Sequence, residues 1–203
     1  MADWRWAAGG RRGTIALCAM LCAALPLPAA ARPAPPAFLT FGRAIDPPRG
    51  FVELCANMQA ICDRMAQGAA ATVPDGPALR ALLGHVNGRV NASVRQQPDA
   101  RTYGHAELWR PSGEGRGAAG DCEDIAIQKR LDLIAAGFPP DRLFFALVYR
   151  SGVGLHLVLV ARLDEGDVVL DSRVDYIQRW SSAGYSWIGA QSPAAPATWR
   201  ALH

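Results

Sequence analysis

The sequence is poor in lysine and in charged residues generally. Lys129 is the only lysine, charged residues make up 19% of the 203 positions, and the formal net charge is +3. A chain without a basic excess or stripe lacks the electrostatic footprint of a nucleic-acid-binding protein. Half of the residues are apolar, and this length is enough for one globular domain with a core but not clearly for two.

No apolar run near the N-terminus is long enough to span a bilayer comfortably. Residues 14–25 (TIALCAMLCAAL) form a short apolar run, with three arginines before it and Ala29-Ala30-Ala31 after it. This order is typical of a secretory signal peptide. We expect residues 1–31 to be removed and residues 32–203 to form the mature domain; an uncleaved membrane anchor is the alternative. Removal of three arginines and one aspartate would leave a net charge of +1.

Cysteine is also scarce, and only Cys55, Cys62 and Cys122 would remain in the mature chain. In an oxidising compartment two of them would pair, and Cys55 and Cys62 are the natural pair. Seven residues of unbroken helix would separate their Cα atoms by about 10.5 Å, whereas a disulfide tolerates at most about 7 Å. Pairing therefore requires a turn between them, for example near Asn57. Otherwise both are buried thiols on one helix. In either case Cys122 has no structural partner.

Helical patterns come first in the chain and strand patterns follow. Proline and alanine dominate the stretch after the signal peptide, which predicts an extended lead-in, and a polar, glycine-rich stretch before Cys122 predicts a long loop. Apolar residues at helical spacing predict three helices, and three short apolar runs predict buried strands. The lead-in is residues 32–50, the helices are 51–65, 78–94 and 121–136, the long loop is 96–120, and the strands are 143–149, 155–161 and 168–171.

Three separated residues, Cys122, His156 and Asp171, form a candidate catalytic set. A thiol, a base and an orienting carboxylate are what nucleophilic attack on an amide requires. A single histidine on a buried strand is more often a core residue, and His156 is distinguished by the carboxylate that ends the next strand. A tight turn at residues 165–166 would place Asp175 opposite His156, so Asp175 is an alternative. Asp171 requires a bulge or a shifted turn.

Three acids flank the candidate nucleophile: Asp121, Glu123 and Asp124. The start of a helix favours a thiolate, but neighbouring carboxylates raise the pKa of a thiol. A bound cation would resolve this conflict, and hard oxygen ligands in an exported protein indicate Ca²⁺. Taken alone, the local sequence favours a simpler interpretation, in which these are the ordinary acids of a helix N-terminus.

The segments around these residues resemble the bacterial transglutaminase-like cysteine proteinases. The resemblance rests on GDCEDIAIQKRLDLIAAGFPPDRLFFALVY and GLHLVLVARLDEGDVVLDS, together with FVELCANMQAIC upstream and GYSWIGAQS near the end. It covers residues 45–192. It implies an α+β, papain-like/transglutaminase-like fold, in which the nucleophile lies at the N-terminus of a helix packed on an antiparallel sheet.

The resemblance also implies residue roles. Cys122 would be the nucleophile, His156 the general base and acid, and Asp171 the orienting carboxylate. Asp121 and Glu123 would bind calcium, which reverses the simpler interpretation of the acids as ordinary helix N-terminal residues. Whether Asp124 also contacts the metal stays open at this point.

The implied activity is that of a periplasmic cysteine endopeptidase, monomeric and with no nucleic-acid partner. Such enzymes cleave a large surface adhesin near its N-terminus at a di-alanine-type site, which releases the adhesin from the outer membrane and disperses biofilm. A cyclic-di-GMP-sensing inner-membrane receptor can sequester them. The alternatives are an amidase or acyl transferase acting on cell-wall peptide or protein, since the same three residues form a thioester there too, and a catalytically idle binding protein of the same fold. The sequence departs from the family at Ser172, where asparagine is common, and in the glycine-rich segment 113–120.

Overall fold

A computed structural model describes residues 34–67 and 76–203, so the predicted signal peptide lies outside the described residues. None of the helices in these two ranges is long and apolar enough to cross a membrane. The helices are α1 (Arg49–Asn57), α2 (Gln59–Ala66), α3 (Pro77–Ser93), α4 (Asp99–Thr102) and α5 (Cys122–Ala135), with 3-10 turns at Pro140–Arg142 and Trp180–Ser182. The strands are β1 (Phe41–Ile45), β2 (Arg95–Gln96), β3 (Ala119–Gly120), β4 (Leu143–Arg150), β5 (Gly154–Leu163), β6 (Gly166–Leu170), β7 (Gln178–Arg179), β8 (Ser186–Ser192) and β9 (Ala195–Leu202).

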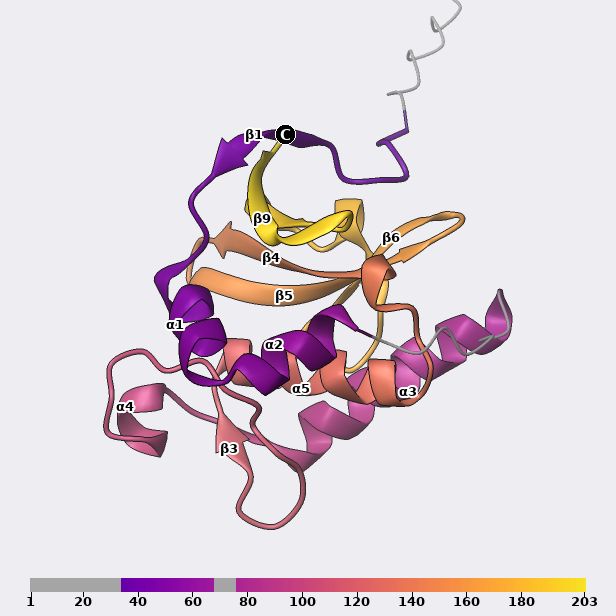
Figure 1. The fold of residues 1–203 in the computed structure, drawn as a ribbon. Helices are drawn as coiled ribbons and strands as arrows, with labels where there is room; N and C mark the ends of the chain where they lie inside the picture. Colours follow the sequence, from indigo (N-terminus) through magenta and orange to yellow (C-terminus); the bar gives the residue numbers. More distant parts are fainter. Residues whose placement is uncertain (1–33, 68–75) are drawn as a thin grey trace, which may run out of the picture. The chain divides into compact units, whose positions relative to one another are not determined.

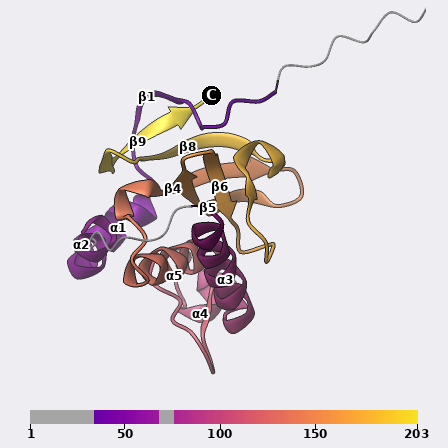
Figure 2. The same cartoon turned by 90° about the vertical axis from the view of Figure 1, so that its right-hand side faces the viewer.

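One seven-stranded sheet organises the fold, in the order β1-β9-β8-β4-β5-β6-β7. Every neighbouring pair in it is antiparallel. The helices lie together on one face of this sheet, with α5 next to it (Figures 1 and 2). This is the expected α+β arrangement, in which a helix that begins at Cys122 packs on an antiparallel sheet.

The core has two parts because both faces of the central strands are buried. Between helices and sheet, Leu83 of α3 and Ile127 of α5 are completely buried, and so is Leu159 of β5. On the other face, Phe144 and Val160 belong to a second apolar cluster. Two buried faces explain why the central strands read as continuous apolar runs rather than alternating ones.

The predicted helix over 51–65 is in fact two helices. Asn57 ends α1, and Met58 leaves the helical region with φ −131° and ψ 54° before α2 begins. The break brings the Cα atoms of Cys55 and Cys62 to 5.4 Å, and the two residues form a disulfide. The predicted pairing and the turn that it requires are both confirmed.

Within the predicted lead-in 32–50, residues 41–45 are extended as expected, but they form a strand of the sheet, and residues 49–50 already belong to α1. Strand β1 pairs with β9 at the edge of the sheet. Leu39 is buried, and its N–H donates to the Asp167 carboxylate at 2.8 Å. The strand that pairs with β1 is about 150 residues away in sequence, so the local sequence pattern gave no sign of this pairing. The predicted loop 96–120 likewise contains α4 and ends in β3, which pairs with β2.

The β5–β6 hairpin has a different register from the tight turn considered above. Leu163 pairs with Gly166, so the two turn residues are Asp164 and Glu165. Gly166 is required there, because its φ is +135° and a Cβ atom would lie 2.5 Å from the Ala37 carbonyl oxygen. The shift by one residue puts Asp171 directly after the paired strand.

Candidate active site

Cys122 is the first residue of α5 and the only free cysteine in the part of the chain that the structure describes. Asp121 occupies the N-cap position but makes no side-chain capping hydrogen bond. The Cys122 thiol donates to Glu123 Oε2 at 3.0 Å. Cys122 is half-buried and packs against the apolar cluster between helices and sheet.

The surroundings of the sulfur keep it protonated. Burial is the largest cause that raises the pKa of Cys122 far above its usual range, and the Glu123 carboxylate raises it further. The Leu157 N–H acts in the opposite direction. In this arrangement the thiol needs a base and a nearby positive charge to become a nucleophile.

His156 lies on β5, is only 3% exposed, and forms a hydrogen bond from Nε2 to Asp171 Oδ1 at 2.8 Å. Residues opposite each other on paired strands share a face, and the β5–β6 register, continued by one residue, sets Asp171 opposite Val158. His156 is two residues along from Val158, so its side chain points to the same face. The imidazole and the carboxylate thus meet diagonally, without a bulge.

Asp171 is held by three donors. Besides His156, Tyr185 OH donates to Oδ2 at 2.6 Å and the Arg173 N–H donates to Oδ1 at 3.0 Å. Burial alone would raise the pKa of Asp171, but the hydrogen bonds from His156 and Tyr185 outweigh it, and the net effect is a lowered pKa. Asp171 is therefore an ionised carboxylate with a fixed orientation.

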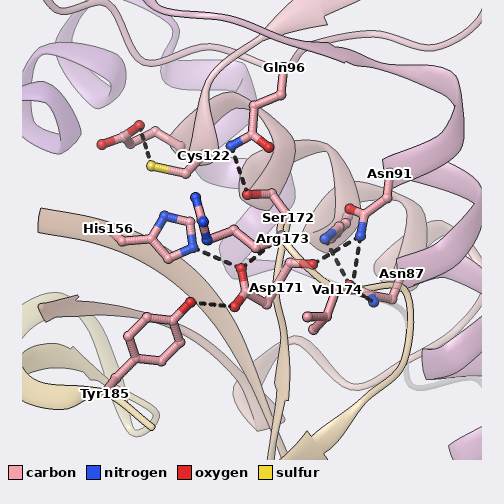
Figure 3. Close-up of polar contacts among 12 residues, drawn as sticks. Asn87, Asn91, Gln96, Cys122, His156, Asp171, Ser172, Arg173, Val174 and Tyr185 are labelled. Carbon is pink, nitrogen blue, oxygen red and sulfur yellow. Dashed lines mark hydrogen bonds and ion pairs between the residues drawn. The ribbon is translucent and has the colours of Figure 1, made fainter. Parts of the chain in front are cut away.

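The ring of His156 lies between the Cys122 sulfur and the Asp171 carboxylate (Figure 3). Because Nε2 is bonded to Asp171, Nδ1 is the ring nitrogen on the Cys122 side. A base whose second nitrogen is bonded to a carboxylate is the arrangement that thiol activation requires.

The loop after Asp171 is fastened to α3. Asn91 Nδ2 donates to the Asp171 carbonyl and to the Val174 carbonyl, both at 3.0 Å, and Asn87 donates to Val174 at 2.8 Å. Asp175, the alternative partner for His156, instead accepts from Asn91 at 3.2 Å. Asn87 and Asn91 together fix the loop that carries the Asp171 carboxylate.

Three carboxylates gather beside the start of α5, from Asp99, Asp121 and Asp124. One ligand atom from each lies within 4.8 Å of the others. Asp124 accepts from Tyr103 OH at 2.7 Å and from the Arg110 N–H at 3.0 Å. The buried Oδ1 atoms of Asp99 and Asp121 have no hydrogen-bond partner among the described residues. This donor set fits a hard cation that prefers oxygen ligands, such as Ca²⁺.

The electrostatics of this acid cluster agree with that fit. Burial, followed by the Glu123 carboxylate, raises the pKa of Asp121 to about 7. Burial also raises the pKa of Asp124 to about 7, despite its hydrogen bonds. Gly120 leaves room for the cluster, because a Cβ atom there would lie 2.5 Å from Asp124 Oδ2. Carboxylates packed this closely need either protons or a cation.

The structure brings the sequence-predicted residues Cys122, His156 and Asp171 together, and it places Asp121 in the acid cluster. Glu123, the other predicted calcium ligand, is bonded to the Cys122 thiol. Sequence reasoning missed Asp99 and Tyr185. Tyr185 lies in the family-like segment GYSWIGAQS, which was a usable signal, whereas nothing in the sequence around Asp99 indicated that this acid would be buried beside Asp121 and Asp124.

A helix that begins at a cysteine and packs on an antiparallel sheet beside a His–Asp pair defines a transglutaminase-like cysteine protease fold. Residues 41–203 match the family of bacterial transglutaminase-like cysteine proteinases, and the chain belongs to that family. It is accordingly a cysteine protease with a protein substrate. No curated protein matches the chain.

Solved structures of LapG from Legionella pneumophila are similar to this chain. The calcium-bound form is 23% identical, with a TM-score of 0.49 over 64% of this chain and 71% of that one. A second LapG structure is 24% identical, with a TM-score of 0.48 over 64% and 70%. The EGTA-treated form is 22% identical, with a TM-score of 0.47 over 64% and 69%.

Proposed function

We propose that this protein is a periplasmic cysteine endopeptidase with Cys122 as nucleophile, His156 as general base and acid, and Asp171 as the orienting carboxylate. The observation that carries the proposal is the His156 ring, which lies between the Cys122 sulfur and an Asp171 carboxylate 2.8 Å from Nε2. Membership of a protease family supports it.

The mechanism follows from these contacts. Asp171 keeps the proton of the neutral imidazole on Nε2, so that Nδ1 can accept the proton of Cys122. The thiol first turns away from Glu123, and the thiolate then attacks the peptide carbonyl to form a thioester. His156 returns the proton to the leaving amine, and water hydrolyses the thioester with His156 again as base.

Calcium belongs to the same proposal. Asp121 would hold the ion, with Asp99 and Asp124 from the acid cluster and Glu123 as the further ligand that the family resemblance implies. A bound cation supplies positive charge beside a thiol that must ionise. The unpartnered Oδ1 atoms of Asp99 and Asp121 support this assignment.

The proposed substrate is a large surface adhesin, cut near its N-terminus at a di-alanine-type site. Cleavage would release the adhesin from the outer membrane and promote biofilm dispersal, and a cyclic-di-GMP-sensing inner-membrane receptor would control access to the enzyme. The family resemblance supports both partners.

The test is cleavage of an N-terminal fragment of the adhesin from the same bacterium by the mature chain. We expect one cut, located by sequencing the new N-terminus, and no cut with Cys122→Ala at unchanged circular dichroism. Ser151→Ala, in an exposed turn, is the control and should cut normally. Turnover by Cys122→Ala would refute the nucleophile. Transfer of the acyl group to an added amine, without hydrolysis, would favour the acyl-transferase alternative.

A further inference from the structure

A pocket lies away from the Cys122 site, between the disulfide-linked helices α1 and α2 and the ends of β8 and β9. Its volume is about 360 Å³, within the roughly 300–1,000 Å³ typical of small-molecule sites. The rim includes Val52 and Asp63, and the Cys55–Cys62 disulfide forms part of the wall. The buried residues of the floor are Phe51, Met65, Arg130 and Gln191.

Arg130 is the unusual member of this floor. It is 1% exposed, and no carboxylate among residues 34–67 and 76–203 forms an ion pair with it. Burial lowers the pKa of Arg130 to about 9, so the guanidinium is still charged at neutral pH. A buried charge without a counter-ion is costly for a folded protein.

The existing contacts of Arg130 satisfy its hydrogen bonds only in part. Nη1 donates to Gln191 Oε1 at 2.7 Å, and Nη2 donates to the Met65 carbonyl at 3.1 Å. The guanidinium also lies 5.1 Å from the centre of the Phe145 ring. All three partners are neutral, and Nε has no acceptor among the described residues. The positive charge at the floor of the pocket therefore remains uncompensated.

We propose that this pocket binds a small organic carboxylate with an apolar body, whose head group pairs with Arg130. An apolar wall with one buried guanidinium suits this ligand class, since Arg pairs with carboxylates through charge-assisted hydrogen bonds. Asp63 at the rim is bonded to Gln59, and its negative charge disfavours a bound orientation with the ligand carboxylate at the rim instead of at Arg130. The site is separate from the catalytic one, because Arg130 lies eight residues, or roughly 12 Å along α5, from Cys122.

The probe is sodium octanoate, titrated into the mature chain by isothermal calorimetry, with 1-octanol and octylamine as matched ligands of the same apolar length. We expect saturable binding of octanoate with one site per chain. Octanol should bind at least about tenfold more weakly, because it lacks the charge that pairs with the guanidinium. Octylamine should not bind.

Two variants distinguish binding in this pocket from nonspecific hydrophobic binding elsewhere on the protein. Arg130→Met keeps a long apolar side chain and should weaken octanoate binding to the level of octanol. If that buried substitution prevents folding, Val52→Trp fills the pocket from a position that is 49% exposed and should abolish binding on its own. Ile188→Trp, at a position that is 38% exposed and outside the pocket lining, is the matched control and should bind normally.

Three results would overturn the proposal. These are the absence of saturable octanoate binding, equal affinities for octanoate and octanol, and undiminished binding by Val52→Trp. Cleavage by the Cys122 site is measured separately, so failure of either assignment leaves the other intact.

Discussion

The contacts of Asp171 decide whether His156 can work as a base. One of these contacts comes from Tyr185, which has no role in the mechanism given above. Its hydroxyl donates to Asp171 Oδ2 at 2.6 Å, and its ring centre lies 5.7 Å from that of His156. Tyr185 does not stand between the sulfur and the base, so we regard it as a positioning residue.

Tyr185→Phe should lower kcat/KM by about tenfold, the scale of one hydrogen bond to a charged group. Loss of a donor that lowers the pKa of Asp171 should also move the acid limb of the pH–rate profile to higher pH. A purely structural role would leave that limb in place. Tyr149→Phe, at a position that is 47% exposed, is the control and should behave like the wild type.

Lys129 is a buried cation whose only hydrogen bond in the described chain goes to Asn87 Oδ1, at 2.8 Å. Burial lowers its pKa from the usual 10.5 to about 7, although Asp171 and Asp175 oppose the shift. Between these two values the unfolded chain binds one proton more than the folded chain. The lysine therefore destabilises the fold most at and below neutral pH, and this cost disappears as the pH rises toward 10.5.

Lys129→Met should accordingly gain stability relative to the wild type at neutral pH and lose that advantage at high pH. Urea unfolding of both proteins across the range from pH 7 to 10.5 measures the difference. A difference that does not change with pH would mean that Lys129 keeps its usual pKa in the folded state. Because only the difference is compared, titration of other groups cancels.

At the scale of elements, the disulfide fixes the angle between α1 and α2. The two helices bracket the break at Met58, and the bridge closes a seven-residue separation. The chain-entropy relation gives about 2 kcal/mol for a loop of this size. The same bridge also forms part of the wall of the Arg130 pocket.

Replacement of both Cys55 and Cys62 by alanine should lower the free energy of unfolding by about 2 kcal/mol, measured by urea denaturation. Cys122→Ala is the matched single-thiol control and should change it far less. A reducing agent should reproduce the loss in the wild type and leave the double variant unaffected. Equal stability of the reduced and oxidised wild type would contradict the prediction.

At the scale of the whole molecule, the acid cluster joins two parts of the chain, α4 and the start of α5. Asp99 comes from α4, Asp121 precedes α5, and Asp124 lies within α5. A cation bound here would link the long segment between α3 and α5 to the helix that carries the nucleophile. Ligand that binds only the folded state stabilises it, by about 2.7 kcal/mol at a hundredfold excess over Kd.

Calcium should therefore raise the melting temperature and support activity, and a chelator should reverse both effects. Asp99→Asn should weaken the calcium-induced rise in melting temperature, whereas Asp141→Asn, at an exposed position, should leave it unchanged. Mg²⁺ should substitute poorly, because it retains its waters. If the chelated enzyme keeps full activity and calcium leaves the melting temperature unchanged, the acids serve only as helix N-terminal residues.

The sequence by itself determined the order of the candidate catalytic residues along the chain and most of the local structure. Apolar spacing located α3 and α5 to within a residue or two, and continuous apolar runs located β4, β5 and β6. Seven residues of continuous helix would hold the two cysteines too far apart for a disulfide, so their pairing required the break that the structure has between α1 and α2. These features depend on local geometry, which a sequence pattern contains.

The tertiary structure alone decided the features that depend on distant partners. The hairpin register selected Asp171 over Asp175, because a shift of one residue in the turn changes which side chain reaches His156. Pairing with β9 made a strand of the lead-in. Burial next to neutral partners left the charge of Arg130 uncompensated. Such properties arise from residues that meet only after folding, so no window of sequence around any one of them contains the information.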